Sequence, residues 1–171
     1  DYLQLEVDDD GSVAAFDDKT LTVTATTAPN LSSYDNQLFV MGQTPPPAQA
    51  LYVTERVGGG VLTAANDFVI EIPAAFPMEW DGAVTTVTLS GPGASRMSTA
   101  VTYPTTRTAL FNVTSNFASG EHVVITGLRF RNFSASSLGV DHLRLQAPPG
   151  TGIDTDDKTI KVDAFTEAPS S

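Results

Sequence analysis

Short runs of β-branched, aromatic and aliphatic residues recur along the whole chain, separated by Gly, Pro, Asn and Asp. Several runs alternate with polar residues at a period of two. Leu128 and Phe130 share one face of such a run, while Arg129 and Arg131 share the other. Helical periodicity is nearly absent, so the pattern predicts an all-β chain.

The alternating and β-rich runs place the expected strands. We expect them at residues 2–7, 20–26, 37–41, 51–55, 68–72, 85–89, 100–103, 108–113, 122–126, 128–133, 142–146 and 159–162. One-sided strands joined by turns, with no helices between them, are typical of antiparallel sheets packed face to face. We therefore predict an immunoglobulin-like or jelly-roll-like antiparallel β-sandwich.

The two ends of the chain carry similar sequences. Asp1-Tyr-Leu-Gln-Leu-Glu-Val, a Gly-containing turn and Asp17-Asp-Lys-Thr-Leu-Thr-Val are matched by Asp141-His-Leu-Arg-Leu-Gln, a second such turn and Asp156-Asp-Lys-Thr-Ile-Lys-Val. The offset is 140 at the first Asp (141 − 1) and 139 at the Asp-Asp-Lys-Thr motif (156 − 17), so the two hairpins differ by one residue. This duplication favours a tandem array or a head-to-tail polymer over a self-contained enzyme.

The duplication divides the chain into three expected parts. Residues 1–23 form a connector hairpin that copies residues 141–162, residues 24–162 form the sandwich, and residues 163–171 form a linker or tail. A lone two-stranded hairpin is marginal in water, so the connector must pack on something.

Two alternatives remain for the connector hairpin. In one, it adds to a sheet edge of a neighbouring subunit, with Leu3, Leu5 and Val7 as the polymerisation interface. In the other, it packs on its own sandwich, and the duplication reflects a cut through a longer array.

Further segments carry a resemblance to a known class of module. They are Asn36-Gln-Leu-Phe-Val-Met-Gly, Ala64-Ala-Asn-Asp-Phe-Val-Ile-Glu-Ile-Pro, Phe76-Pro-Met-Glu-Trp-Asp, Ile125-Thr-Gly-Leu-Arg-Phe-Arg-Asn-Phe, and an Asp-x-Leu-x-Leu motif after them. Together they resemble the tandem immunoglobulin-like β-sandwich repeats of large secreted and surface-anchored microbial proteins. The resemblance covers nearly the whole period and includes no catalytic motif. It implies an extracellular, repeated, structural or adhesive module.

The amino-acid composition limits the classes of partner and site that we expect. The formal net charge is −11, and only nine residues are Lys or Arg, which argues against nucleic acid and anionic membranes as partners. The chain has no Cys, which excludes disulfides, thiol catalysis and Cys-based zinc sites. No apolar run approaches the length of a membrane span, so no membrane insertion is expected. Abundant Thr and Ser with scarce Lys favour a secreted or cell-surface location.

Clustered carboxylates suggest a calcium site. The candidate ligands are Asp8, Asp9, Asp10, Asp17 and Asp18 in the first copy and Asp154, Asp156 and Asp157 in the second. Ca²⁺ takes six to eight oxygen ligands, which such loops can supply, although the bidentate Glu of an EF-hand is missing. The alternative is a set of solvated turn residues, because Asp favours turns. No other cofactor is indicated.

An alternative function is carbohydrate binding. Trp80 is the single tryptophan and lies between Glu79 and Asp81, and Tyr52 is a second aromatic candidate. β-Sandwich modules can bind sugars on aromatic side chains with nearby carboxylates. The competing interpretation, which we favour, places Trp80 in the core.

Asn30, Asn112 and Asn132 each begin an Asn-x-Ser/Thr sequence, the acceptor pattern for N-glycosylation. The pattern is short and often occurs by chance.

No catalytic motif is present. His122 and His142 lie on expected strands, with no nucleophile elbow or zinc-binding helix elsewhere. No catalytic residue is assigned, and the chain is not expected to be an enzyme.

These observations predict a structural subunit or repeat of an extracellular filament or surface array. It would be joined head to tail to copies of itself or to adjacent repeats by β-strand complementation. The alternative is a carbohydrate-binding or adhesive β-sandwich module with a polysaccharide partner.

Overall fold

The computed structural model describes residues 4–6, 13–16, 28–150 and 154–165. The elements are β1 (Gln4–Glu6), β2 (Val13–Phe16), β3 (Asn30–Ser33), β4 (Gln37–Val40), β5 (Leu51–Thr54), β6 (Phe68–Glu71), β7 (Glu79–Trp80), β8 (Thr88–Ser90), the 3₁₀ helix η1 (Pro92–Arg96), β9 (Met97–Thr105), β10 (Thr108–Val113), β11 (His122–Thr126), β12 (Phe130–Arg131), β13 (Arg144–Gln146), β14 (Asp154–Thr155) and β15 (Ile160–Asp163).

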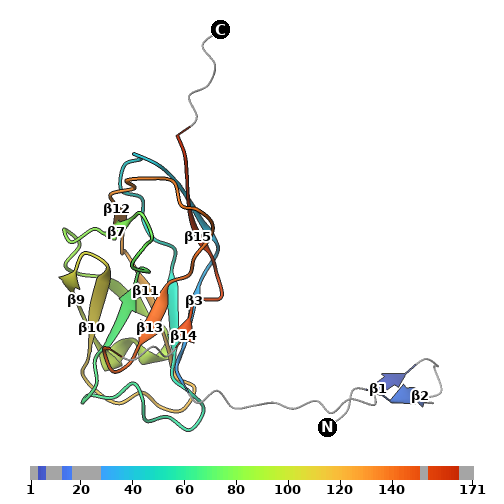
Figure 1. Ribbon diagram of the computed structural model, residues 1–171. Coiled ribbons are helices and arrows are strands. Elements are labelled where there is room, and N and C mark those ends of the chain that lie inside the picture. Colours follow the sequence, from blue (N-terminus) through green and yellow to red (C-terminus); the bar gives the residue numbers. More distant parts are fainter. Residues whose placement is uncertain (1–3, 7–12, 17–27, 151–153, 166–171) are drawn as a thin grey trace.

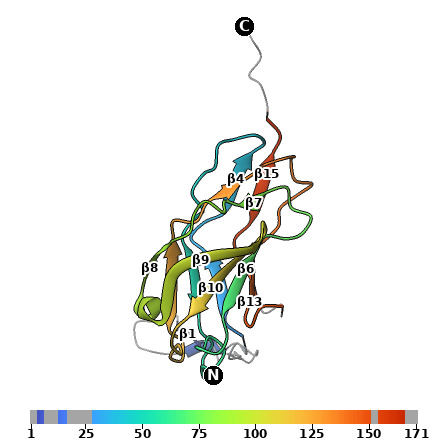
Figure 2. The ribbon, with the colours of Figure 1, turned by 90° about the vertical axis from the view of Figure 1, so that its left-hand side faces the viewer.

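The strands form a β-sandwich, which confirms the predicted all-β class (Figure 1). One sheet has five strands in the order β14-β13-β6-β10-β9, and the other has four in the order β3-β5-β11-β8. Two-stranded pairs, β12-β7 and β15-β4, complete the sandwich, and β1 pairs with β2. In Figures 1 and 2 the sandwich is elongated: the chain enters β3 near one end and leaves beyond β15 at the other.

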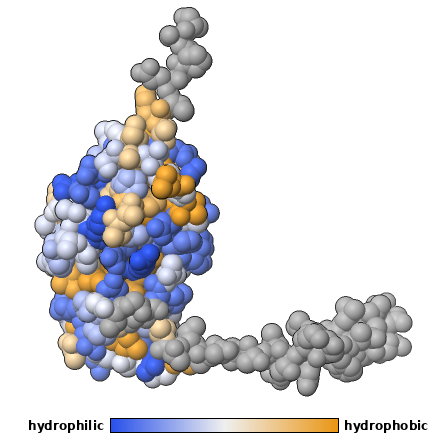
Figure 3. Space-filling model, viewed as in Figure 1, coloured by the Kyte–Doolittle hydropathy of each residue, from blue (hydrophilic) through white to orange (hydrophobic). Residues whose placement is uncertain are grey.

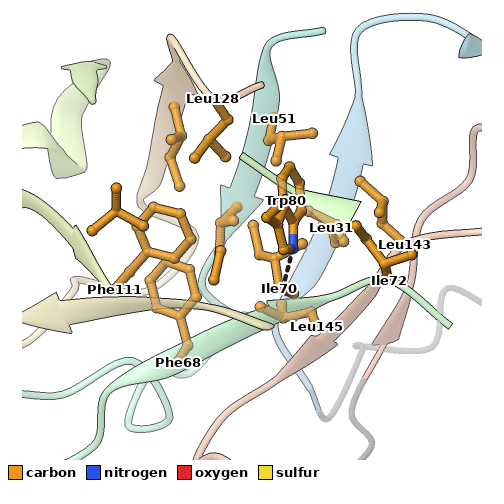
Figure 4. Close-up of a cluster of buried hydrophobic side chains, with 14 of the residues drawn as sticks. Leu31, Leu51, Phe68, Ile70, Ile72, Trp80, Phe111, Leu128, Leu143 and Leu145 are labelled. Atoms are coloured by element: carbon orange, nitrogen blue, oxygen red, sulfur yellow. Dashed lines mark hydrogen bonds between the residues drawn. The ribbon is translucent and has the colours of Figure 1, made fainter. Parts of the chain in front are cut away.

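The core lies between the two larger sheets. Alternate residues point inward, so Val53 and Ile125 from one sheet and Ile70 and Leu145 from the other are all 0% exposed. Figure 4 shows these inner faces meeting around Trp80. Each fully buried side chain of this size contributes about 1.5–3 kcal/mol relative to exposure.

The alternation in the sequence was a good guide to strands with one polar face. β10 and β11 have the predicted limits. Leu128 and Phe130 are buried, and Arg129 and Arg131 are exposed, as the pattern predicted, although only two of these residues form a strand. The strand expected at residues 20–26 lies outside the described residues.

Strands β2, β3, β7 and β14 were not predicted, and neither was a parallel pairing. β3 was missed because Leu31 is its only large apolar residue, which leaves no alternating pattern; the strand pairs with β5, with Leu31 opposite Val53. The sandwich is also not wholly antiparallel: β15 runs parallel to β4, with Ile160 opposite Gln37 and Asp163 opposite Val40. Alternation identifies a strand but says nothing of its direction.

Trp80 links the small β12-β7 pair to the core. Its ring is 1% exposed and stacks on Phe130, with the centroids 4.5 Å apart. Its Nε1–H donates to the carbonyl of Ile70 at 3.2 Å, which satisfies the one polar atom of the ring (Figure 4). The side chain is thus both packed and hydrogen-bonded.

We expect Trp80→Ala to lower the free energy of unfolding by about 3–5 kcal/mol, because it leaves a large cavity. Tyr52→Ala, at a half-buried position of β5, is the matched control and should cost less. Urea unfolding measures both changes. A loss for Trp80→Ala no larger than that for Tyr52→Ala would contradict the core role.

Candidate functional site

Residues 141–162, here called the closing segment, complete the sandwich at three places. β13 pairs antiparallel with β6, so that Arg144 lies opposite Glu71 and Leu145 opposite Ile70. β14 extends the same sheet beyond β13. β15 pairs with β4. The segment therefore joins the five-stranded sheet to a strand pair outside it.

Among its described residues, 141–150 and 154–162, the closing segment buries an apolar side chain at five positions. Their exposed fractions are at most 1%, and they are Leu143, Leu145, Ala147, Ile160 and Val162. All five belong to the main hydrophobic core. Removing the segment would therefore expose one side of the core to water.

Three carboxylates in and after β14 bind β3. Asp154 accepts hydrogen bonds from the backbone N–H of Leu31 at 2.7 Å and from Asn30 Nδ2 at 3.1 Å. Asp157 accepts one from the Ser32 hydroxyl at 2.7 Å. These bonds connect β3, which has few apolar residues, to residues that lie 123 to 125 positions further along the sequence.

Asp156 makes the most buried of these contacts. It is 2% exposed, and it accepts hydrogen bonds from the Ser33 backbone N–H at 2.8 Å, from the Ser33 hydroxyl, and from the Lys158 backbone N–H at 3.0 Å. We call the two Ser33 donors the Ser33 socket. Burial raises the pKa of Asp156 above its usual value, although the hydrogen bonds from Ser33 and Lys158 oppose the rise.

Asp157 and His142 make further hydrogen bonds in the turn at residues 156–158. The pKa of Asp157 is lowered by hydrogen bonds from Lys158, whose Nζ lies at 2.6 Å, and from Ser32. His142 Nδ1 lies 2.8 Å from the carbonyl oxygen of Asp156 and 3.0 Å from that of Lys158. This places the His142 ring in a supporting role for the turn.

β15 is lined on both edges. On one side the backbone N–H of Gln37 donates to the carbonyl of Thr159 at 2.8 Å. On the other, Asp141 and Ile160 exchange backbone bonds, and the N–H of Ser137 donates to the carbonyl of Val162 at 2.7 Å. A strand near the end of the chain is thus held as an inner strand.

The described strands of the N-terminal copy, β1 and β2, pair with the register of β13 and β14 at two positions. β1 and β2 pair Gln4 with Phe16 and Leu5 with Ala15. With the sequence offsets of 140 and 139, these pairs correspond to Arg144 with Thr155 and Leu145 with Asp154 in the closing segment. The copies therefore share backbone pairing as well as sequence. Of the expected interface residues, Leu5 lies in β1, whereas Leu3 and Val7 lie outside the described residues.

The predicted calcium ligands are only partly described. Asp8, Asp9, Asp10, Asp17 and Asp18 lie outside the described residues. Asp154, Asp156 and Asp157 bind β3 instead of converging on one point. Within the part of the chain that the structure describes, no group of three or more His, Cys, Asp or Glu side chains is placed to hold a metal ion. Calcium binding stays a prediction from the sequence.

The ring of Trp80 is buried in the core, as the favoured interpretation of the sequence predicted, so it is not exposed as an aromatic platform for the alternative, carbohydrate binding. Tyr52 is half-buried on β5. A surface depression of about 440 Å³ beside Trp80 is lined mainly by Thr residues, Tyr103 and Arg131. Burial and the nearby Asp81 raise the pKa of Tyr103 to about 12, so its hydroxyl stays protonated.

The three candidate glycosylation asparagines are exposed. Two of them use their amide nitrogen: Asn30 donates to Asp154, and Asn112 donates to Asp67 at 3.0 Å. Asn132 adopts a positive φ of 55°, a conformation that Asn tolerates better than most residues. Glycosylation at these positions stays a prediction.

No protein-family model matches the chain, and no curated protein matches it at a significant level. None of the helices in the described ranges is long and apolar enough to cross a membrane.

The pKa of Asp156 gives a testable pH dependence. A carboxyl whose pKa is raised on folding binds more protons in the folded state, so its contribution to stability falls as pH rises above 3.8 through the raised value. We therefore expect the unfolding free energy of the wild type to fall relative to that of Asp156→Asn as pH rises through this window.

Asp157→Asn is the matched control for this measurement. Its lowered pKa predicts the opposite sign: stability from Asp157 is present above 3.8 and is lost as pH falls through the lowered value. Urea unfolding over a pH series measures both. A wild-type advantage over Asp156→Asn that grows with pH would contradict the account.

Proposed function

We propose that this chain is a structural subunit or repeat of an extracellular filament or surface array. Its units are joined head to tail by β-strand complementation, with residues 1–23 as the connector. The partners are copies of the same sandwich.

The shared hairpin register carries this proposal. One sandwich uses one closing segment, and residues 141–162 already fill that place here. Residues 1–23 are a second copy whose β1-β2 pairing matches that of β13-β14. A spare closing segment has a use if it completes another sandwich, since a strand added to a sheet gains main-chain hydrogen bonds and side-chain burial.

The path of the chain supports a linear assembly. The chain enters the sandwich at β3 near one end and leaves beyond β15 at the other (Figure 1). Only six residues separate Val23, at the end of the N-terminal copy, from Asn30 at the start of β3 (residues 24–29). A linker this short keeps successive units close together.

The surface charge favours association only through specific contacts. The net charge is −11, and the visible face in Figure 3 is mostly polar. Long-range charge repulsion opposes nonspecific association. Phe165, the last described residue, is 60% exposed.

Within one chain, residues 141–162 fill the groove more readily than residues 1–23 of another chain do. Covalent attachment gives residues 141–162 an effective concentration on the order of millimolar within their own chain. The full chain therefore stays closed on itself when dilute. Exchange between chains needs unfolding and refolding at comparable protein concentration.

We expect the full chain, refolded at about 1 mM, to form a series of oligomers or filaments. A chain that lacks residues 1–23 should refold as a monomer, because the described sandwich begins at β3 and keeps its own closing segment. Size-exclusion chromatography and negative-stain electron microscopy measure the outcome.

The matched control is the full chain with Leu5→Asp and Leu21→Asp. It keeps the length of the connector but removes two of its apolar residues, and it should also refold as a monomer. Oligomers of the same size distribution from the truncated chain would show that residues 1–23 are not the connector.

A further inference from the structure

We infer that residues 1–23 occupy, in a neighbouring sandwich of this fold, the position that residues 141–162 occupy in their own. The receiving surface is the groove bounded by the edge of β6, the Ser33 socket and the edge of β4. This inference rests on the proposed function and specifies its partner: a second copy of the sandwich whose groove is open.

The apolar positions match throughout. The five buried residues of the closing segment are Leu143, Leu145, Ala147, Ile160 and Val162, and the same positions in the N-terminal copy hold Leu3, Leu5, Val7, Leu21 and Val23. All five of these apolar positions are therefore apolar in both copies, and the buried Asp156 has Asp17 as its counterpart. Exposed positions have diverged, as with Arg144 against Gln4.

The hydrogen-bonding positions match in part. Asp17 corresponds to Asp156 and supplies a carboxylate for the Ser33 socket. Thr20 corresponds to Thr159, whose backbone bonds the Asn36 side chain at 2.9 Å and the Gln37 N–H at 2.8 Å. The two Thr159 contacts use its backbone N–H and carbonyl, so they do not depend on the side chain at this position.

One difference between the copies lowers the affinity of residues 1–23 for the groove. Ala15 stands where the closing segment has Asp154, which accepts hydrogen bonds from Leu31 and Asn30. In a groove filled by residues 1–23, these two donors lose that carboxylate. The N-terminal copy thus fits the groove but binds it less tightly than the groove's own segment.

A grafted chain tests the fit directly. In the full chain, residues 141–162 are replaced by the sequence of residues 1–23, and thermal unfolding is followed by circular dichroism. We expect cooperative melting a few degrees below the wild type. Adding Ala15→Asp to the graft should raise the melting temperature by about 2–4 °C, since it restores the bonds to Leu31 and Asn30.

The control graft carries Leu5→Asp and Leu21→Asp, which place charges at positions the groove buries, and it should melt without cooperativity. Non-cooperative melting of the unmodified graft, beside a cooperative wild type, would overturn the inference. So would a graft that Ala15→Asp destabilises.

The inference and the proposed function fail separately. Oligomers that require residues 1–23, together with a graft that does not fold, would keep the assembly function and overturn the proposed position. A folded graft with the Ala15→Asp gain, together with a full chain that refolds only as a monomer, would keep the fit and overturn the assembly function.

Discussion

The sandwich depends on a bond between its first and last parts. β3 has one large apolar residue and pairs with β5 in the four-stranded sheet. It is also bound by the carboxylates of Asp154, Asp156 and Asp157, from 123 to 125 residues further along. The buried Asp156 is the central member, because leaving its Ser33 partners unpaired in the interior would cost about 1–3 kcal/mol for each group.

The dependence of β3 on the closing segment bears on the duplication of that segment in residues 1–23. Residues 141–162 contribute strands, buried side chains and the β3 anchors together, while the rest of the sandwich holds the matching groove. A separate copy of such a segment can complete another sandwich by binding the same groove, so no additional binding surface is needed. Covalent linkage then decides whether a groove is filled from its own chain or from a neighbour.

The sequence predicted the parts of the structure that depend on local pattern. The alternation at residues 108–113 and 122–126 predicted the limits of two strands. In the N-terminal copy, β1 pairs with β2 at residues 13–16, which was not predicted as a strand. The sequence did not predict β3, which has one large apolar residue and no alternating pattern, or the parallel pairing of β15, which depends on a distant partner. The favoured core position of Trp80 agrees with the structure, because a lone tryptophan among apolar neighbours is more often packed inside than exposed.

A disulfide between two chains tests the central claim most directly, because the chain has no native Cys. Arg144 lies opposite Glu71, so Gln4 of one chain should lie opposite Glu71 of its neighbour. Chains with Gln4→Cys and chains with Glu71→Cys are refolded together at about 1 mM and then oxidised. The account predicts a disulfide-linked heterodimer that disappears when the Gln4→Cys chain also carries Leu5→Asp. Absence of the heterodimer, or its persistence with Leu5→Asp, would contradict the account.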